Sequence, residues 1–289
     1  MRNALNFNSL EVISKYMKLF GGSVKKKTAY VAVIAIIVIV FAALALTSFS
    51  GQSNASYINS ELGKPVSQQA MSLLNVPSSV SDKIGIGSVS GFPTSISAPA
   101  LESGGKPEIL YIGAEYCPYC AITRWGMIIA LMRFGNFYNL HYMASNASDV
   151  FPNTPTFTFY NSTYTSNYIV FVSVETTTRS RFQNLQEPTP LENSIFSKYN
   201  PGGGIPFVDF ANESIQLGAP LDPEIVAGYT WNGILSNLTD TNSSISQSIV
   251  GSADVFTAEI CKITNDTPES VCSQPYVTET LNALGSKGT

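Results

Sequence analysis

Two cysteines, Cys117 and Cys120, lie three positions apart in the string Cys-Pro-Tyr-Cys. Two thiols at this spacing on one helical turn are close enough to form a disulfide. At the start of a helix, Cys117 would face unpaired backbone N–H groups and the positive end of the helix dipole, and both lower the pKa of a thiol. We therefore predict a thiol–disulfide exchange centre in which Cys117 attacks and Cys120 resolves the mixed disulfide.

The segments on either side of this pair can position it. Residues 109–112, Ile-Leu-Tyr-Ile, form a continuous apolar run that is typical of a buried central strand. From residue 121 onward the apolar side chains follow a helical period, and Gly135-Asn136 is a suitable stop. The apolar stripe comprises Ala121, Ile122, Trp125, Ile128, Ile129 and Met132, whereas Thr123, Arg124 and Arg133 lie off it. The pair is thus expected at a strand-to-helix junction, with Pro118 in the first turn.

Other chemistries compete for the same two thiols. A zinc site needs about four ligands, and the chain has four cysteines and one histidine, His141. Cys261 and Cys272 would have to complete such a site, but ten residues separate them, which is not a usual spacing for zinc. A copper-handling pair and an inert structural disulfide are further alternatives. We favour redox chemistry and predict no bound metal and no cofactor.

The second pair, Cys261 and Cys272, favours a structural interpretation. These residues end one predicted helix and precede another, across a loop that contains the turn residues Asn265, Asp266 and Pro268. A disulfide here would staple the C-terminal hairpin and stabilise it by about 3 kcal/mol through loop-closure entropy. A second exchange-active pair is the alternative.

The remaining segments predict a mixed α/β domain. Predicted in chain order are a short helix at 65–74, a strand at 140–144, a hairpin of strands 156–160 and 168–176, a helix at 190–199, strands 207–210 and 214–217, and helices that begin near 222, 244 and 276. The helix near 222 is expected to reach about residue 238, because Asp222-Pro223-Glu224 is a typical helix start.

An uncharged apolar run at residues 29–49 is long enough to cross a bilayer as a helix of about 20 residues. Three lysines at 25–27 lie directly before it, and the next basic residue is Lys64. The positive-inside rule then places the N-terminus in the cytoplasm and the rest of the chain outside. We predict an uncleaved signal anchor in the cell membrane, and a signal peptide cleaved near Ala43-Leu44-Ala45 is the alternative.

Composition agrees with an exterior location. Seven Asn-x-Ser/Thr sequons all lie after the apolar run and are glycosylation candidates: Asn54, Asn146, Asn161, Asn212, Asn237, Asn242 and Asn265. Charged residues make up only 12% of the chain, about half the usual share. The chain therefore lacks the basic stripe that binding to nucleic acid requires.

Four parts follow from these patterns. Residues 1–28 would be a basic cytoplasmic N-terminus, 29–49 the membrane anchor, and 50–106 a stalk with a covering segment. Residues 107–289 would form the redox domain, with an insertion at about 141–204 and helices at its C-terminal end.

The strand, Cys-Pro-Tyr-Cys, the amphipathic helix and the later Gly204-Ile205-Pro206 before a strand resemble the thioredoxin superfamily. The string 111–121, with Arg124-Trp125 and residues 133–137, looks like an uncharacterised membrane-anchored thioredoxin-like family of thermoacidophilic archaea. The resemblance implies a central mixed sheet flanked by helices and a late structural cysteine pair. It also implies a cis bond before Pro206 that faces the active-site pair.

The resemblance further assigns roles to single residues. Ile205, Pro206 and Tyr119 would bind an extended substrate. The buried acid that assists the resolving cysteine of thioredoxins has no clear counterpart in this chain, and Glu115 is the candidate for that role as a proton shuttle. The chain departs from thioredoxins in having Tyr116, not Trp, before the first cysteine. The implied activity is disulfide formation or isomerisation in exported proteins, with protein thiols and disulfides as partners. The alternative is a non-catalytic accessory subunit of a membrane or cell-surface complex.

Overall fold

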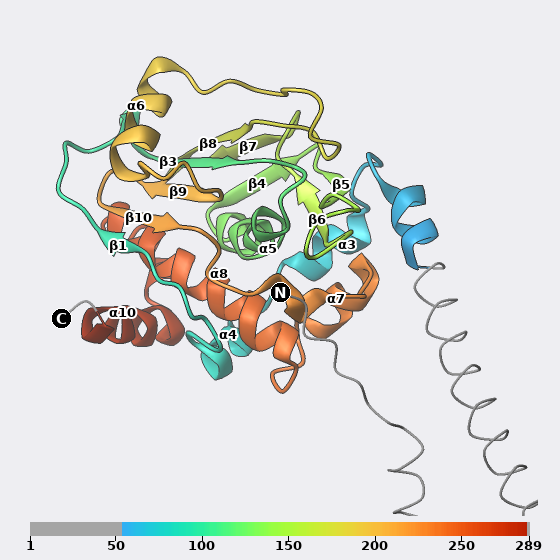
Figure 1. Ribbon diagram of the computed structural model, residues 1–289. Helices are drawn as coiled ribbons and strands as arrows, with labels where there is room; N and C mark the ends of the chain where they lie inside the picture. The colour runs from blue at the N-terminus through green and yellow to red at the C-terminus, as the bar shows by residue number, and fades with distance from the viewer. Residues whose placement is uncertain (1–53, 288–289) are drawn as a thin grey trace, which may run out of the picture. The chain divides into compact units, whose positions relative to one another are not determined.

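Strand β3 (Lys106–Gly113) lies at the centre of the main sheet in a computed structural model, which describes residues 54–287. It pairs in parallel with β8 (Val170–Glu175) and antiparallel with β9 (Phe207–Phe210). β9 continues to β10 (Ser214–Leu217) in an antiparallel pair (Figure 1). The sheet is therefore mixed, as expected for the predicted fold class.

Two short strands complete the sheet. β1 (Thr94–Ser95) pairs with β10, and β2 (Glu102–Ser103) pairs with the first residues of β3. Both come from the segment that precedes the Cys pair, which therefore contributes to the central sheet.

Side chains of β3 alternate between two apolar cores. Ile109 and Tyr111 face the larger core, which contains helices α5 (Pro118–Met132) and α8 (Ser244–Ile263). Leu110 and Ile112 face a smaller core that includes side chains of α6 (Pro190–Tyr199). Helices thus cover both faces of the sheet (Figure 1), and every residue from 109 to 112 is buried because both faces are covered.

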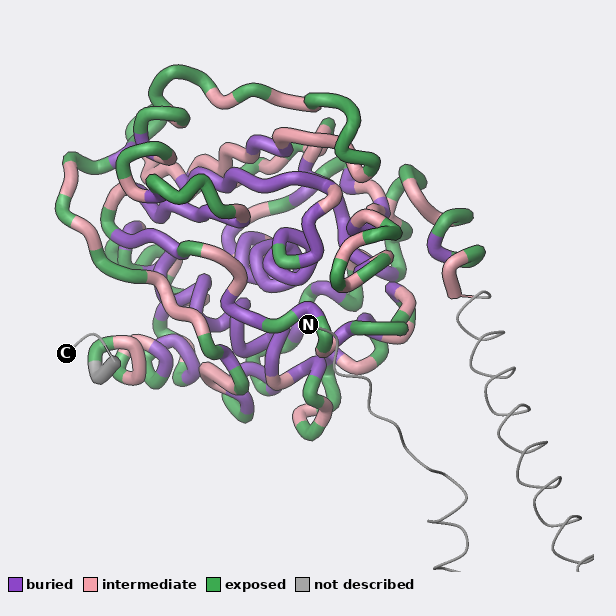
Figure 2. The backbone as a smooth tube through the Cα atoms, viewed as in Figure 1, coloured by how far each residue is buried: buried purple, intermediate pink, exposed green. Residues whose placement is uncertain are grey.

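Helix α5 is buried on nearly all sides, as the purple coil in the middle of Figure 2 shows. The expectation that Thr123 and Arg124 lie off the buried stripe is wrong, because both are fully buried. Gly126 makes the close approach to α8 possible, since a Cβ at this position would lie only 2.0 Å from Ser252 Oγ.

The predicted hairpin of strands 156–160 and 168–176 does not form. Strand β6 (Pro155–Thr158) pairs with β5 (His141–Ala144), and β7 (Thr163–Ser166) pairs with β4 (Gly135–Tyr138). The later segment becomes β8 and enters the central sheet. The sequence pattern indicated strands correctly but not their partners, because alternation says nothing about which edge a strand joins.

The predicted helix from Asp222 to Leu238 is also interrupted. A 3-10 turn at Pro223–Val226 is followed by Gly228, whose φ of +76° ends it, and α7 (Trp231–Asn237) then begins at its Thr230 cap. The side chain of Thr230 accepts a hydrogen bond from the amide of Gly233, so the second start has its own cap.

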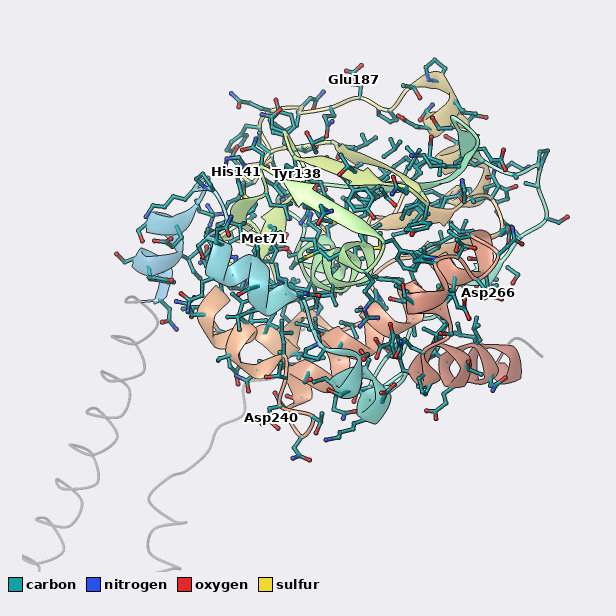
Figure 3. All side chains as sticks on the ribbon, turned by 180° about the vertical axis from the view of Figure 1, so that it is seen from behind. Met71, Tyr138, His141, Glu187, Asp240 and Asp266 are labelled. Carbon is teal, nitrogen blue, oxygen red and sulfur yellow. A yellow bond between two sulfur atoms is a disulfide. The ribbon has the colours of Figure 1, made fainter. Side chains whose placement is uncertain are left out.

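Helices from both ends of the described chain cover the lower part of the domain in Figure 1. Ahead of the sheet come α3 (Gln68–Leu74) and α4 (Ser78–Ile84), and behind it α9 (Glu269–Cys272) and α10 (Pro275–Lys287). A disulfide joins Cys261 to Cys272, which is the pairing predicted from the sequence. It spans the loop that contains Asp266 (Figure 3).

The predicted anchor at 29–49 and the cytoplasmic segment 1–28 lie outside the described residues. Within residues 54–287, no helix is long and apolar enough to cross a membrane.

Candidate functional site

The Cys-Pro-Tyr-Cys segment lies at the junction between β3 and α5. Cys117 is the N-cap of α5, and its Sγ accepts a hydrogen bond from the amide of Cys120 at 3.1 Å. Pro118 occupies the first turn, where its missing N–H leaves no helical hydrogen bond unmade. Both cysteines are free thiols.

The two thiols have opposite pKa shifts. Hydrogen bonding from the Cys120 thiol lowers the pKa of Cys117, and so do the Cys120 amide and the charge of Arg124, against the opposing effect of burial. Burial raises the pKa of Cys120 well above its ordinary value, and the hydrogen bond that it donates to Cys117 adds to the rise. Because the thiolate is the nucleophile, Cys117 is the more reactive of the two.

The loop before β9 faces Cys117. The peptide bond between Ile205 and Pro206 is cis, and the carbonyl oxygen of Ile205 lies 3.9 Å from Cys117 Sγ. The amide of Gly218, just after β10, donates to the carbonyl of Pro206 at 2.9 Å and so ties this loop to the neighbouring strand. The structure therefore brings Cys117 to the Ile205-Pro206 segment, although Ile205 lies 88 positions later in the sequence.

A buried ion pair lies behind the cysteines. Arg124 donates to Glu175 through two bonds, Nε to Oε1 at 2.8 Å and Nη2 to Oε2 at 2.6 Å. Neither side chain is exposed to solvent. The sequence analysis did not predict this ion pair. The signal that could have indicated it is Arg124 itself, a charged residue inside an otherwise apolar helix that begins at the Cys pair.

Glu115, the candidate proton shuttle, is buried but bonds to neither thiol. Its carboxylate accepts from the Thr158 hydroxyl at 2.9 Å and from the Arg179 amide at 3.3 Å. Burial raises the pKa of Glu115, and the nearby charge of Glu175 adds to the rise. Glu115 therefore ties the Cys loop to β6 and to the loop after β8.

Two loops of the predicted insertion lie against the Cys pair. Tyr119, which is 42% exposed, packs edge-to-face on Phe151 with ring centroids 6.0 Å apart. The guanidinium of Arg181 lies 4.4 Å from the ring centroid of Tyr116 and forms an ion pair with Asp149. Between these tyrosines, Cys117 is only 5% exposed and Cys120 is fully buried.

A cavity of about 310 Å³ opens beside the same loop and is lined by residues 150–154 and by residues around Val226. The larger cavity, about 730 Å³, lies in a different part of the domain, between β1, α8 and α10. Neither of these two cavities is lined by a cysteine.

His141 lies on β5, outside the Cys site (Figure 3). Among residues 54–287, no group of three or more His, Cys, Asp or Glu side chains could hold a metal ion.

The seven sequon asparagines fall into two groups. Asn54, Asn146, Asn212 and Asn237 use their amide nitrogens in hydrogen bonds to backbone carbonyls. Asn161, Asn242 and Asn265 are exposed. The second group offers the more accessible acceptors for a glycan.

Comparison with known proteins gives one match. The chain belongs to the family described as "Domain of unknown function (DUF929)", which it matches over residues 93–262, more than half of its length. That span contains the Cys pair, the Arg124–Glu175 ion pair and the Ile205–Pro206 loop. No curated protein and no solved structure matches the chain.

Proposed function

We propose that this protein is a thioredoxin-like thiol–disulfide oxidoreductase that forms or isomerises disulfides in exported proteins. One observation carries the proposal. Cys117 caps a helix, accepts the amide of Cys120 and faces the carbonyl of Ile205 before a cis-proline. A helix cap of this kind stabilises a thiolate, and the facing carbonyl belongs to a strand-like loop beside which an extended peptide could lie.

The central sheet supports the thioredoxin-like assignment. The strands β8-β3-β9-β10 form one parallel pair and two antiparallel pairs, so the sheet is mixed and flanked by helices, as the sequence resemblance implies. The Cys helix follows the central strand β3 directly, and the cis-proline directly precedes β9, the antiparallel neighbour of β3 in the sheet. Fold alone does not establish activity, so the proposal rests on the site.

The proposed exchange proceeds in two steps when the pair starts as a disulfide. A substrate thiolate attacks Cys117 Sγ, a new S–S bond forms, and the bond to Cys120 breaks. Cys120 leaves with the electron pair as a thiolate and then takes up a proton. A second substrate thiolate attacks the substrate sulfur of the mixed disulfide, and Cys117 leaves as a thiolate.

The substrate loses two electrons and the cysteine pair gains them. An external disulfide restores the pair by the reverse exchange, and isomerisation needs no net transfer. The lowered pKa of Cys117 makes it a good leaving group in the second step, in which the substrate is released.

We further propose that the domain is held outside the cytoplasm by a membrane anchor at residues 29–49. The apolar run and the preceding lysines at 25–27 support the anchor and its orientation. The Cys261–Cys272 disulfide is consistent with an oxidising compartment.

A second candidate is a non-catalytic accessory subunit. It is favoured by the small exposure of Cys117, 5%, since an enzyme of this type must present its nucleophile to a protein substrate. In that case the two loops over the Cys pair would be a permanent cover.

An exchange assay separates the two candidates. The full-length chain would be incubated with a fluorescent dithiol peptide in a glutathione redox buffer, and disulfide formation followed with time. We expect catalysis that Cys117→Ser abolishes. The matched control, Cys261→Ser/Cys272→Ser, removes the other disulfide and should keep the activity. A wild-type chain that gives only the buffer rate would reject the enzyme and leave the accessory subunit.

A further inference from the structure

The guanidinium of Arg124 is charged and buried one helical turn after Cys120. Positions four apart lie on the same face of a helix, so the arginine follows the resolving cysteine along α5. Burial favours loss of this charge, yet the coupling to Glu175 holds the pKa of Arg124 well above its ordinary value. A full positive charge is therefore maintained in the interior beside the Cys pair.

Hydrogen bonds connect this charge to the Cys loop. Arg124 Nη2 donates to the carbonyl of Ala114 at 2.8 Å, and the amide of Cys117 donates to the same carbonyl at 3.3 Å. The arginine and the nucleophilic cysteine thus share one acceptor. A displacement of Arg124 would release the loop that carries Cys117.

The third nitrogen of the Arg124 guanidinium, Nη1, makes none of these hydrogen bonds. Arg124 Nη1 is buried and has no hydrogen-bond partner among the described residues. The hydroxyl of Tyr111, whose ring centroid lies 5.8 Å from Arg124 Cζ, is also buried without a partner. Buried polar groups are seldom left unsatisfied, so each of these two atoms calls for an explanation.

Opening the Cys disulfide creates a negative charge on Cys120, with which the Arg124 guanidinium interacts electrostatically. When a substrate thiolate attacks Cys117, the electron pair of the broken bond moves to Cys120, which is fully buried. A thiolate in an apolar interior is unfavourable, and burial alone would oppose the step. A fixed positive charge near the leaving sulfur offsets that penalty without any rearrangement.

We propose that Arg124 is a positioning residue that stabilises the thiolate of Cys120 as it leaves, and that Glu175 limits how far it does so. The inference rests on the proposed exchange function. The Arg124–Glu175 pair then sets the reduction potential of the Cys117–Cys120 pair. Other charged or titratable groups around the thiols are Glu115, which interacts with both Arg124 and Glu175, and the tyrosines Tyr111 and Tyr116, with Arg181 and Asp149 beside Tyr116.

A purely structural role makes a different prediction. Arg124 joins α5 to β8 through Glu175, so any change to either residue could loosen the fold. Under that role, all variants would lower stability and would leave the redox equilibrium unchanged or shift it in one direction. The electrostatic role requires shifts of opposite sign.

The test uses two variants of the full-length chain with opposite charge effects. Glu175→Gln keeps a hydrogen-bond acceptor but leaves the arginine charge uncompensated. We expect the pKa of Cys117 to fall by about one unit and the pair to become about tenfold easier to reduce, about 30 mV. Arg124→Met/Glu175→Leu removes both charges with similar volumes, and we expect shifts of similar size in the other direction.

Arg124→Lys serves as the conservative rescue, because it keeps the charge and loses the fork of donors. Its potential should stay close to that of the wild type. Thiolate absorbance against pH gives the pKa, equilibration with glutathione buffers gives the potential, and urea unfolding reports stability. Should Glu175→Gln not fold, a double variant that is harder to reduce beside an unshifted Arg124→Lys still supports the inference, because Arg124→Lys also loses the fork of donors but keeps the charge. An unshifted double variant, or an equal shift in Arg124→Lys, overturns it.

Equal potentials in all variants, or shifts of one sign, would overturn the inference. These measurements need no protein substrate, so they separate this inference from the proposed function. A wild-type chain that exchanges disulfides with an unshifted double variant rejects the role of Arg124 alone. A wild-type chain that does not exchange, but shows the opposite shifts, rejects the enzyme and retains the electrostatic coupling.

Discussion

The two cysteine pairs occupy opposite ends of their helices. Cys117 and Cys120 open α5 as free thiols, whereas Cys261 lies near the end of α8 and is bonded to Cys272. At the helix start, an amide donates to Cys117 Sγ. Near the helix end, the carbonyl of Cys261 instead accepts from the Asp266 amide, and the exposed dipole end is negative.

Under the proposed function, position on a helix, more than the presence of two thiols, separates a pair that exchanges from a structural disulfide. The helix start stabilises a thiolate at Cys117, whereas the helix end gives Cys261 no such stabilisation, so the Cys261–Cys272 disulfide should persist. Burial does not distinguish the two pairs, because all four cysteines are buried.

Alkylation should show the largest difference between the two cysteine pairs. With the folded full-length chain, reduced mildly at pH 7, iodoacetamide should modify Cys117 at least about 100-fold faster than Cys120, because thiolate fraction and access both favour Cys117. Cys261 and Cys272 should stay unmodified until the chain is denatured and reduced. Peptide mass spectrometry measures each site, and equal labelling of Cys117 and Cys120 would contradict the assigned roles.

Cysteine replacements in each pair compare what the two pairs contribute to the free energy of unfolding. Cys261→Ala/Cys272→Ala should lower the free energy of unfolding by about 3 kcal/mol, because the loop between α8 and α9 is then free in the unfolded chain. Under reducing conditions, Cys117→Ser should change it by less than about 1 kcal/mol. Urea unfolding compares them, and the staple interpretation is wrong if the first variant is as stable as the wild type.

The free energy of unfolding should rise as the pH is lowered through 6, because of Asp209 in the strand β9. Burial raises the pKa of Asp209, on the strand after Pro206, to about 6, although the amide of Asn212 opposes the shift. The folded state therefore holds the proton more tightly than the unfolded state, whose carboxyl titrates near 3.8. This contribution is complete below pH 4 and is lost as pH rises through 6, on the order of 2 kcal/mol in total.

The matched variant for this prediction is Asp209→Asn, which keeps the acceptor for the Asn212 amide. It should flatten the rise in unfolding free energy between pH 7 and pH 5. Asp254 on α8 also has a pKa raised by burial to about 6, but replacing it would leave Arg133 without its ion-pair partner. An unchanged pH slope in Asp209→Asn would refute the assignment.

The smallest expected effect concerns the loop over Tyr116. Arg181 is half-exposed and its ion pair with Asp149 should contribute at most about 1 kcal/mol. Arg181→Ala should nevertheless raise the alkylation rate of Cys117 about two- to threefold, because the guanidinium that covers Tyr116 is lost. Stability should not change measurably. A rate equal to that of the wild type would show that this loop does not restrict access.

Local patterns predicted what local interactions determine. The helix over 190–199, the strands 207–210 and 214–217, and the disulfide across 11 positions all appear where expected. Each depends on caps, alternation or short loops that a few neighbouring residues specify. The placement of Ile205-Pro206 opposite Cys117 came from the family resemblance and not from the pattern.

Long-range partners were not predictable in this way. The side chain of Arg124 was expected off the buried stripe, but Glu175, 51 positions later, compensates its charge inside the core. Likewise, the sequence pattern predicted the β8 segment as one strand of a hairpin, whereas its partner in the structure is the parallel strand β3. Partner choice of this kind depends on the assembled fold, which no window of sequence contains.

The complete burial of Cys120 would make an exchange reaction at this pair one-sided. If the pair exchanges as proposed, a partner can reach only Cys117, and every covalent complex forms through that one sulfur. A chain with Cys120→Ser would then be unable to release its captured partner from within. Expressed in its native host, such a chain would act as bait that retains physiological clients as stable adducts, and reductive elution would identify them.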